Sequence, residues 1–277
     1  MADVVSSAAT TTATPSTEGV PAVQTALPGN PAAAGPKITG NVDLRPSVQV
    51  EDGLFYSEDA IEMGVQFAPG RSITYVQTFY TAEPGQQQNV LKPTASPGYL
   101  RSKVGNIGKL PGGITVSCEN RTYLPTWEFD RNRGQIASFR NYFKFNKDFG
   151  PQFSLTFMEL PIFHVFSKGG NGTAANPIFE NRFYLIGTWN ISDKLSFTLP
   201  IMFHQTRHRE FAADKQFSNG WSFFVWVNPE ISYTVSANLS VGLGYYSGDV
   251  VARDLTALAI EDGFAHGVFQ LFANMAI

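Results

Sequence analysis

The sequence predicts an all-β protein, an antiparallel up-and-down β-barrel that spans a membrane. Three observations lead to this prediction: segments in which apolar residues alternate with period two, connections that alternate between short and long, and a shortage of charge. Charged residues make up 16% of the 277 residues and aromatic residues 13%, whereas a soluble domain is about one quarter charged. Part of the molecular surface is therefore expected to face something other than water.

Period-two alternation is clearest in the C-terminal half of the chain. In 179–191, 195–204, 221–235 and 239–245, the odd-numbered positions are mainly apolar, and the even-numbered positions are polar or mixed. The final segment continues this pattern with one apolar row, Phe269, Leu271, Ala273, Met275 and Ile277. Such alternation is typical of strands with one apolar face.

Alternation upstream is less regular but predicts further strands. The candidates are 61–67, 71–80, 135–146 and 152–166. Within the last of these we expect the phase of the alternation to change near Pro161. The pattern in 81–134 is weak, and we expect at least one hairpin there, around 114–118 and 122–129. These segments give 8 to 12 strands, and 10 or 12 is favoured because single-chain bacterial barrels have even numbers.

Connections between the candidate strands differ in length in a regular way. Short connections with turn-forming residues lie at 146–151, 191–194 and 236–238, and long ones at about 167–177, 206–219 and 247–262. Tight turns on one side and long loops on the other are typical of membrane barrels. Trp189 and Tyr233 lie beside short turns and Trp221 beside a long loop, as interfacial girdles require. These features favour an outward apolar face over the inward one of a soluble barrel or sandwich.

The ends of the chain set the domain boundaries. Residues 1–42 consist mainly of Ala, Thr, Ser, Pro, Gly and Val, a composition that predicts disorder. The barrel is therefore expected to occupy 43–277. The chain begins without the basic and apolar regions of a signal peptide, so we expect it to be the mature form of an exported protein.

Residues 135–277 resemble the C-terminal half of Gram-negative outer-membrane β-barrel proteins. The segment 189–196 is similar to their strand–turn–strand units, and the final strand is similar to the signal read by the barrel-insertion machinery. That signal commonly ends in an aromatic residue, and Ile277 departs from it. The resemblance implies an outer-membrane location, with membrane lipids, lipopolysaccharide and the insertion machinery as partners. The net charge of −3 gives no strong field for nucleic acid, so we expect no nucleic-acid partner.

No catalytic, metal-binding or cofactor-binding set is evident. The segment 216–220 resembles the His-x-Ser-Asn segment of outer-membrane lipid hydrolases, but Gln216 stands where the base that activates Ser218 is needed. A lipid hydrolase is therefore the third hypothesis, and no cofactor is expected. The four histidines are His164, His204, His208 and His266. His204 and His266 fall on polar rows beside Gln, Asn and Ser and are interpreted as lumen residues rather than metal ligands. His208 belongs to the charged segment 204–210, which enters a long loop.

Five charged residues fall on polar rows and are the candidates for lining the barrel lumen: Arg140, Lys144, Glu180, Arg182 and Glu230. In a narrow barrel such charges pair and fill the interior, whereas in a wider one they line a water path and bias ion selectivity. Their charges sum to +1, so weak selectivity is expected. The leading hypothesis is a small pore or channel for ions or small solutes. The alternative is a structural or interaction barrel with a side-chain-filled lumen.

Overall fold

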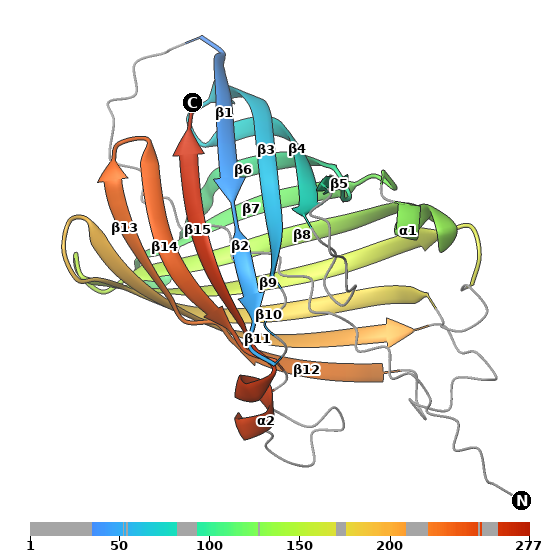
Figure 1. The fold of residues 1–277 in the computed structure, drawn as a ribbon. Coiled ribbons are helices and arrows are strands. Elements are labelled where there is room, and N and C mark those ends of the chain that lie inside the picture. Colours follow the sequence, from blue (N-terminus) through green and yellow to red (C-terminus); the bar gives the residue numbers. More distant parts are fainter. Residues whose placement is uncertain are drawn as a thin grey trace, which may run out of the picture.

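The computed structural model describes residues 35–51, 53, 55–81, 93–126, 128–169, 176–208, 221–248, 250 and 260–277. In this part of the chain, β-segments form one antiparallel sheet that closes into a barrel of twelve strands (Figure 1). Three of the barrel strands consist of two segments each, which are β1 with β2, β5 with β6, and β12 with β13. The even strand number predicted from the sequence is confirmed. No helix in these ranges is long and apolar enough to cross a membrane.

The strands are β1 (Lys37–Leu44), β2 (Pro46–Gln49), β3 (Phe55–Ala68), β4 (Arg71–Thr81), β5 (Pro93–Ala95), β6 (Tyr99–Leu110), β7 (Ile114–Tyr123), β8 (Gln135–Asp148), β9 (Phe153–Phe166), β10 (Pro177–Asn190), β11 (Leu195–His208), β12 (Trp221–Val227), β13 (Glu230–Ser236), β14 (Leu239–Tyr246) and β15 (Val268–Ala276). The helices are α1 (Glu128–Asn132), α2 (Ile260–Ala265) and the 3-10 turn Pro111–Gly113.

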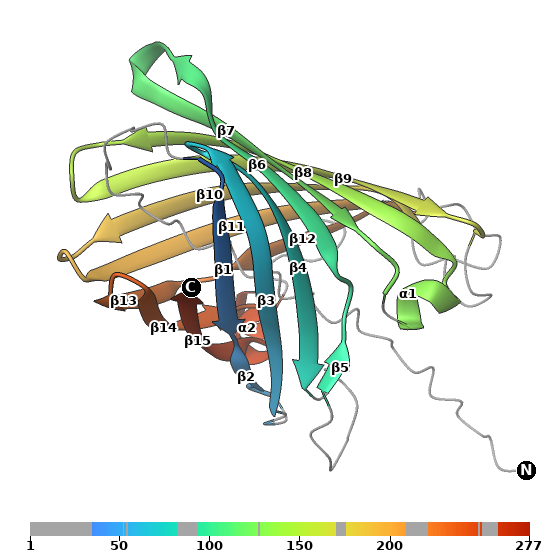
Figure 2. The same ribbon diagram turned by 90° about the horizontal axis from the view of Figure 1, so that it is seen from above.

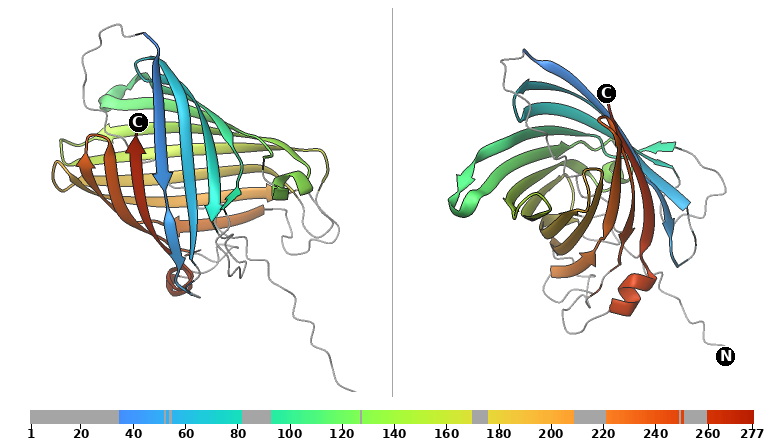
Figure 3. Two further views of the ribbon diagram at one scale, coloured as in Figure 1. Left: turned by 45° about the horizontal axis from the view of Figure 1, so that its top comes forward. Right: turned by 90° about the vertical axis from the view of Figure 1, so that its left-hand side faces the viewer.

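The last strand closes the barrel by pairing with the first. On one side β15 pairs with β14, and on the other with β1 and β2, with Leu44 opposite Ala273. Beyond this ladder, Gly40 and Ile277 exchange two backbone hydrogen bonds of 3.3 and 2.9 Å. Figure 3 shows the C-terminus beside β1. Every strand therefore has two neighbours, which a strand in lipid requires because acyl chains cannot hydrogen-bond to a free edge.

Short and long connections lie at opposite ends of the barrel, as the sequence predicted. The short turns are 69–70, 111–113, 149–152, 191–194 and 237–238. The longer connections at the other end are 50–54, 82–92, 124–134, 167–176, 209–220 and 247–267. Gly70 in the tightest turn has φ +70°, and its carbonyl accepts a 2.6 Å hydrogen bond from Gly105 N–H. A side chain at Gly105 would meet the Gly70 backbone at 3.2 Å, so both positions favour glycine.

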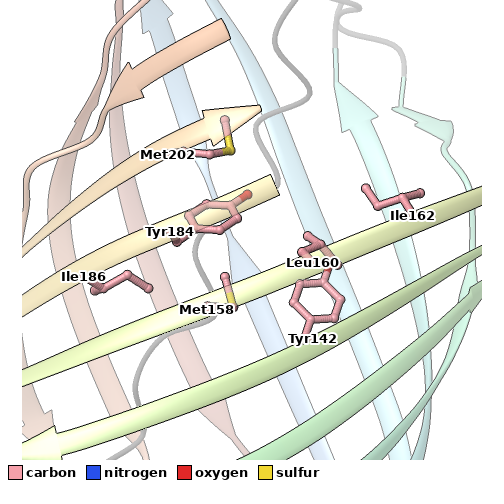
Figure 4. Close-up of a cluster of buried hydrophobic side chains, with 7 residues drawn as sticks. All are labelled: Tyr142, Met158, Leu160, Ile162, Tyr184, Ile186 and Met202. Atoms are coloured by element: carbon pink, nitrogen blue, oxygen red, sulfur yellow. The ribbon is translucent and has the colours of Figure 1, made fainter. Parts of the chain in front are cut away.

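Apolar rows face outward and the alternate rows face inward. Among the predicted outward residues, the exposed ones include Leu185, Ile201, Ile231, Tyr233, Val241, Leu243, Phe269, Leu271 and Met275. Inward-facing neighbours such as Tyr184 and Ile186 are buried. Figure 4 shows an apolar cluster on the inner face of β8–β11, formed by Tyr142, Met158, Leu160, Ile162, Tyr184, Ile186 and Met202. The lipid-facing assignment made from the sequence therefore holds for these strands.

Aromatic side chains gather on the outer wall near the short turns. The ring of Phe153 lies 4.7 Å from that of Trp189 and 5.7 Å from that of Phe149, and Trp189 lies 6.1 Å from Phe197. These residues flank the turns 149–152 and 191–194. Their position agrees with the interfacial girdle predicted from Trp189, where the rings rest at the boundary between lipid and water.

Three sequence-based expectations about strand positions need correction. The first strand begins at Lys37, inside the segment 1–42 that we expected to be disordered; residues 1–34 lie outside the described ranges. A hairpin was expected around 114–118 and 122–129, but β7 runs continuously from Ile114 to Tyr123 and α1 follows it. The hairpin in this region is β6–β7 with its turn at 111–113, and it projects from the short-turn end (Figure 2). A register shift between Val104 and Gly108 explains why its alternation was hard to detect.

The expected change of phase near Pro161 does not occur. Pairing of β9 with β10 runs without a register shift from Phe153 to Phe163. The row that begins at Phe153 therefore continues outward through Glu159 and Pro161. The alternate residues, among them His164, face inward.

Replacing Leu185 with Arg should destabilise the barrel by about 2–4 kcal/mol, because the charge would enter the lipid-facing belt near mid-depth. Asn274, which faces inward opposite Asp43, provides the control. Asn274→Arg should cost much less, since its charge would meet a carboxylate. Urea unfolding in lipid vesicles measures both, and equal losses would contradict the face assignment.

Deleting residues 268–277 should abolish folding, because β14 and β1 would each be left with an unpaired edge in lipid. The heat-dependent shift in gel mobility that folded barrels show is the measurement. An equally long deletion within residues 1–34 should leave that shift unchanged. A truncated chain that still shows the shift and resists protease would refute closure of the barrel by β15.

Candidate functional site

The interior of the barrel carries the densest set of charged side chains in the described strands. All five residues singled out in the sequence lie on inward rows: Arg140 and Lys144 on β8, Glu180 and Arg182 on β10, and Glu230 on β13. The alternate positions on the same strands, such as Phe143, Leu185 and Ile231, are exposed. The pleat of each strand therefore separates interior charge from the outer apolar surface.

Glu180 is the centre of a buried cluster at the long-loop end of the barrel. Its Oε1 lies 2.8 Å from His164 Nε2, and its Oε2 lies 2.9 Å from His204 Nε2 and 3.1 Å from Arg182 Nη2. Thr206 Oγ1 also lies 2.9 Å from His204 Nε2. One carboxylate thus joins β9, β10 and β11. The Nε2 atoms of His164 and His204 both point at this carboxylate. In the described ranges, no group of His, Cys, Asp or Glu side chains has a metal-binding arrangement.

A second cluster stacks arginine on tyrosine. Arg121 on β7 donates a 2.6 Å hydrogen bond from Nε to Glu119 Oε1. Its guanidinium carbon lies 4.4 Å from the ring centre of Tyr142 and 5.1 Å from that of Tyr99. These distances allow cation–π attraction, which strengthens when the groups are shielded from water. The side chain of Arg121 is therefore held in place from three neighbouring strands.

Arg140 and Lys144 extend this cluster along β8. The Arg140 guanidinium carbon lies 3.9 Å from the ring centre of Tyr123. Lys144 Nζ is 4.0 Å from Glu119 Oε2, at the limit of an ion pair. The Lys144 side chain keeps 24% of its surface exposed, so it is more open than the residues around Glu180.

Two further ion pairs lie on other strands. Arg101 on β6 donates two hydrogen bonds, of 3.1 and 2.6 Å, to the two carboxylate oxygens of Glu62 on β3. Arg45 lies between β1 and β2, and its Nη2 is 2.8 Å from Asp43 Oδ2. Parallel hydrogen bonds from one guanidinium to one carboxylate fix both position and orientation. These pairs therefore hold the interior geometry of the N-terminal strands.

Polar contacts continue across the seam where the barrel closes. Arg45 Nη1 donates a 3.3 Å hydrogen bond to Gln270 Oε1, and Gln270 Nε2 donates one of 3.0 Å to Ser47 Oγ. Gln270 is fully buried. Nearby, Tyr246 O–H donates a 2.6 Å hydrogen bond to Glu230 Oε1. The fifth candidate residue is thus paired with a tyrosine rather than with a basic residue.

Basic and acidic side chains concentrate on different walls of the interior. The basic ones on β6, β7, β8 and β10 are Arg101, Lys103, Arg121, Arg140, Lys144 and Arg182, with Glu119 and Glu180 among them. The acidic ones on β1, β3 and β13 are Asp43, Glu58, Glu62 and Glu230, with Arg45 close by. Opposite charges on facing walls produce a field across the interior rather than along it.

Loops at the long-loop end are tied together above the Glu180 cluster. Asn176, which is fully buried, accepts a 2.9 Å hydrogen bond from Arg133 Nε and donates 3.0 Å hydrogen bonds to the carbonyls of Arg133 and Lys168. Asp130 in α1 lies outside the membrane-spanning strands. Its burial raises the pKa of the carboxyl group to about 6, against the opposing effect of Arg133.

The main interior partners missed in the sequence are His164, Glu62, Arg101, Glu119 and Arg121. A signal for some of them was present, because an acid followed two residues later by Arg occurs in 43–45, 119–121 and 180–182. Residues two apart on a strand share a face, and all three pairs form ion pairs of 2.6–3.1 Å. The cross-strand partners have no comparable local signal. The possible hydrolase segment 216–220 lies outside the described ranges.

Comparison with solved structures supports the architecture. The NanC porin is 9% identical in sequence, with a TM-score of 0.56, and the match covers 84% of this chain and 98% of that one. An outer-membrane channel from Pseudomonas putida F1 is also 9% identical with a TM-score of 0.56, and the match covers 91% of this chain and 99% of that one. This chain has the fold of an outer-membrane channel. The resemblance drawn from the sequence is confirmed at the level of the fold. Comparison with protein-family models and with curated proteins finds no match.

Replacing Glu180 with Ala should destabilise the barrel by about 3–5 kcal/mol, because the buried Arg182 would lose its carboxylate partner. The double variant Glu180→Ala, Arg182→Met should recover much of this loss, since no buried charge would remain at either position. Urea unfolding measures both variants. Asp193→Ala, in an exposed turn, is the control and should change little. Additive losses in the double variant would contradict a coupled pair.

Proposed function

We propose that this chain forms a narrow channel for ions or small polar solutes in the outer membrane of a Gram-negative bacterium. The observation that carries the proposal is the combination of a closed barrel, an apolar outer wall and an interior with basic and acidic walls. Similarity in fold to a porin and an outer-membrane channel supports it. Charged side chains inside a lumen act on a passing ion at short range and with little screening, so they influence its passage strongly.

The most open interior charges are the best candidates for contact with a solute. Lys144 and Arg101 keep 24% and 20% of their side-chain surface, and Lys103 is exposed. Glu180 and Arg182 lie deep in their cluster, so their role in the proposal is to hold the wall in place. Because one wall is basic and the other is acidic, we expect weak net ion selectivity and a preference for small dipolar solutes.

A barrel with a filled lumen is the second candidate, and burial favours it. Arg121, Glu119 and Arg182 are buried although they lie on interior rows, and so are Met158 and Leu160. Side chains that lose this much surface leave little room for water beside them. In this case the protein serves as a structural or interaction barrel. Single-channel conductance of the purified, folded protein in a planar bilayer distinguishes the two functions.

Two further partners belong to the proposal. The barrel-insertion machinery recognises β15, whose outward residues Phe269, Leu271 and Met275 form an exposed apolar row. Lipopolysaccharide surrounds the outer wall toward the long-loop end, as expected for the outer leaflet of such a membrane. Truncation of β15 tests the first of these contacts.

Replacing both Arg140 and Lys144 with Glu should make the channel measurably selective for cations. The summed charge of the five candidate residues changes from +1 to −3, and ions that pass these residues respond to the change. The reversal potential under a salt gradient is the measurement. Lys194→Glu, in the exposed turn 191–194, is the control and should leave the potential unaltered.

Two results count against the channel. A reversal potential that stays the same in the double variant places Arg140 and Lys144 off the ion path. If folded parent protein does not conduct at all, the filled barrel is the correct interpretation.

A further inference from the structure

An acidic residue lies on the lipid-facing surface of the barrel. Glu159 is the seventh of the fourteen residues of β9 and shares its outward row with Phe157 and Phe163, both exposed. Its cross-strand neighbours are Phe143 on β8 and Phe183 on β10. The carboxylate therefore stands near mid-depth, among aromatic rings, where lipid tails would surround it.

Within the described part of the chain, Glu159 has no hydrogen-bond or ion-pair partner. The interior carboxylates differ in this respect, since Glu62, Glu119, Glu180 and Glu230 each accept a hydrogen bond. Acyl chains offer no donors, and a polar group without a partner in an apolar medium is costly. Ionisable residues facing a membrane are rare and usually have a functional partner.

Amide side chains surround Glu159 on the same outward surface. Asn141, Asn181 and Gln205 lie on the outward rows of β8, β10 and β11, with Asn181 directly opposite Gln205. Asn120 on β7 donates a 2.8 Å hydrogen bond to Asn141, and the buried Oδ1 of Asn181 has no hydrogen-bond partner. We call these five residues the lateral polar patch: Asn120, Asn141, Glu159, Asn181 and Gln205.

The patch is confined to one wall. Strands β7–β11 lie side by side (Figure 1). On the adjacent wall, which begins where β13 pairs with β11, the outward rows of β13, β14 and β15 present Ile231, Val241, Leu243 and Leu271. A uniform lipid coat explains the apolar rows of that wall but gives no reason for a carboxylate and four amides on the other.

We propose that the lateral polar patch is the contact face for a second copy of this chain. The patch holds both an acceptor, Glu159, and several amide donors, so it is complementary to itself across a two-fold axis. Each Glu159 carboxylate accepts hydrogen bonds from amides of the other copy. The rings of Phe143, Phe157 and Phe183 supply the apolar area around this polar centre, and aromatic residues are enriched in such contacts.

The oligomeric state in mild detergent tests the proposal. Native mass spectrometry of the parent protein should give twice the monomer mass, and Glu159→Leu should give the monomer. The barrel of this variant should resist urea at least as well as the parent barrel. In the monomer, residue 159 faces lipid, and Leu suits that apolar surface better than Glu does. Glu159→Gln keeps an acceptor and should give a mixture. Leu243→Ala on β14, outside the patch, is the control and should remain a dimer.

Cross-linking in membranes provides an independent measurement. In a Cys118→Ser background, cysteine is placed at Leu185, which lies opposite Phe157 and is 46% exposed, or at Leu243, which is 43% exposed. Disulfide-linked dimers should form through the first position and not the second. A monomeric parent protein, equal cross-linking at both positions, or a dimer that survives Glu159→Leu would overturn the proposal.

Discussion

Hydrogen bonding between the first and last strands is the constraint on which the rest of this structure depends. Without the pairing of β15 with β1 and β2, two strand edges would face lipid with unsatisfied backbone groups, and no open sheet of this kind is stable there. Closure also brings Gln270 against Arg45 and Ser47. The seam is thus joined by side chains inside as well as by backbone, and the two termini of the barrel are held at the short-turn end.

Closure places each strand between two different surroundings, and the period-two pleat sorts its residues accordingly. The segments 119–121 and 180–182 show this within three residues. Glu and Arg face inward as ion pairs, and the Asn between them faces the membrane. The inward pairs are stabilised by shielding from water and by neighbouring tyrosines. The outward Asn residues have no such surroundings, and they lie in the lateral polar patch.

Interior charges differ in how tightly they are packed from one part of the barrel to another. Around Glu180 the charges are buried and joined across three strands, so removing one partner leaves the others uncompensated. Around Lys144 and Lys103 the side chains retain contact with solvent space and can change without the same cost. In the channel that we propose, this division keeps the wall rigid and leaves the more open residues to contact the solute.

The sequence alone determined that the chain forms an even-numbered membrane barrel, and it identified the outward rows of β10, β13, β14 and β15. It also placed Arg140, Lys144, Glu180, Arg182 and Glu230 on inward rows. These properties are local, because alternation and turn length are set by neighbours along the chain.

Only the tertiary structure decided which strands meet, and hence that Arg101 pairs with Glu62 and that two histidines share Glu180. It also showed that Glu159 faces lipid, since Pro161 obscured the phase of β9 and only its continuous register with β10 resolves it. Such contacts depend on register between strands that are distant in sequence, which no local pattern encodes.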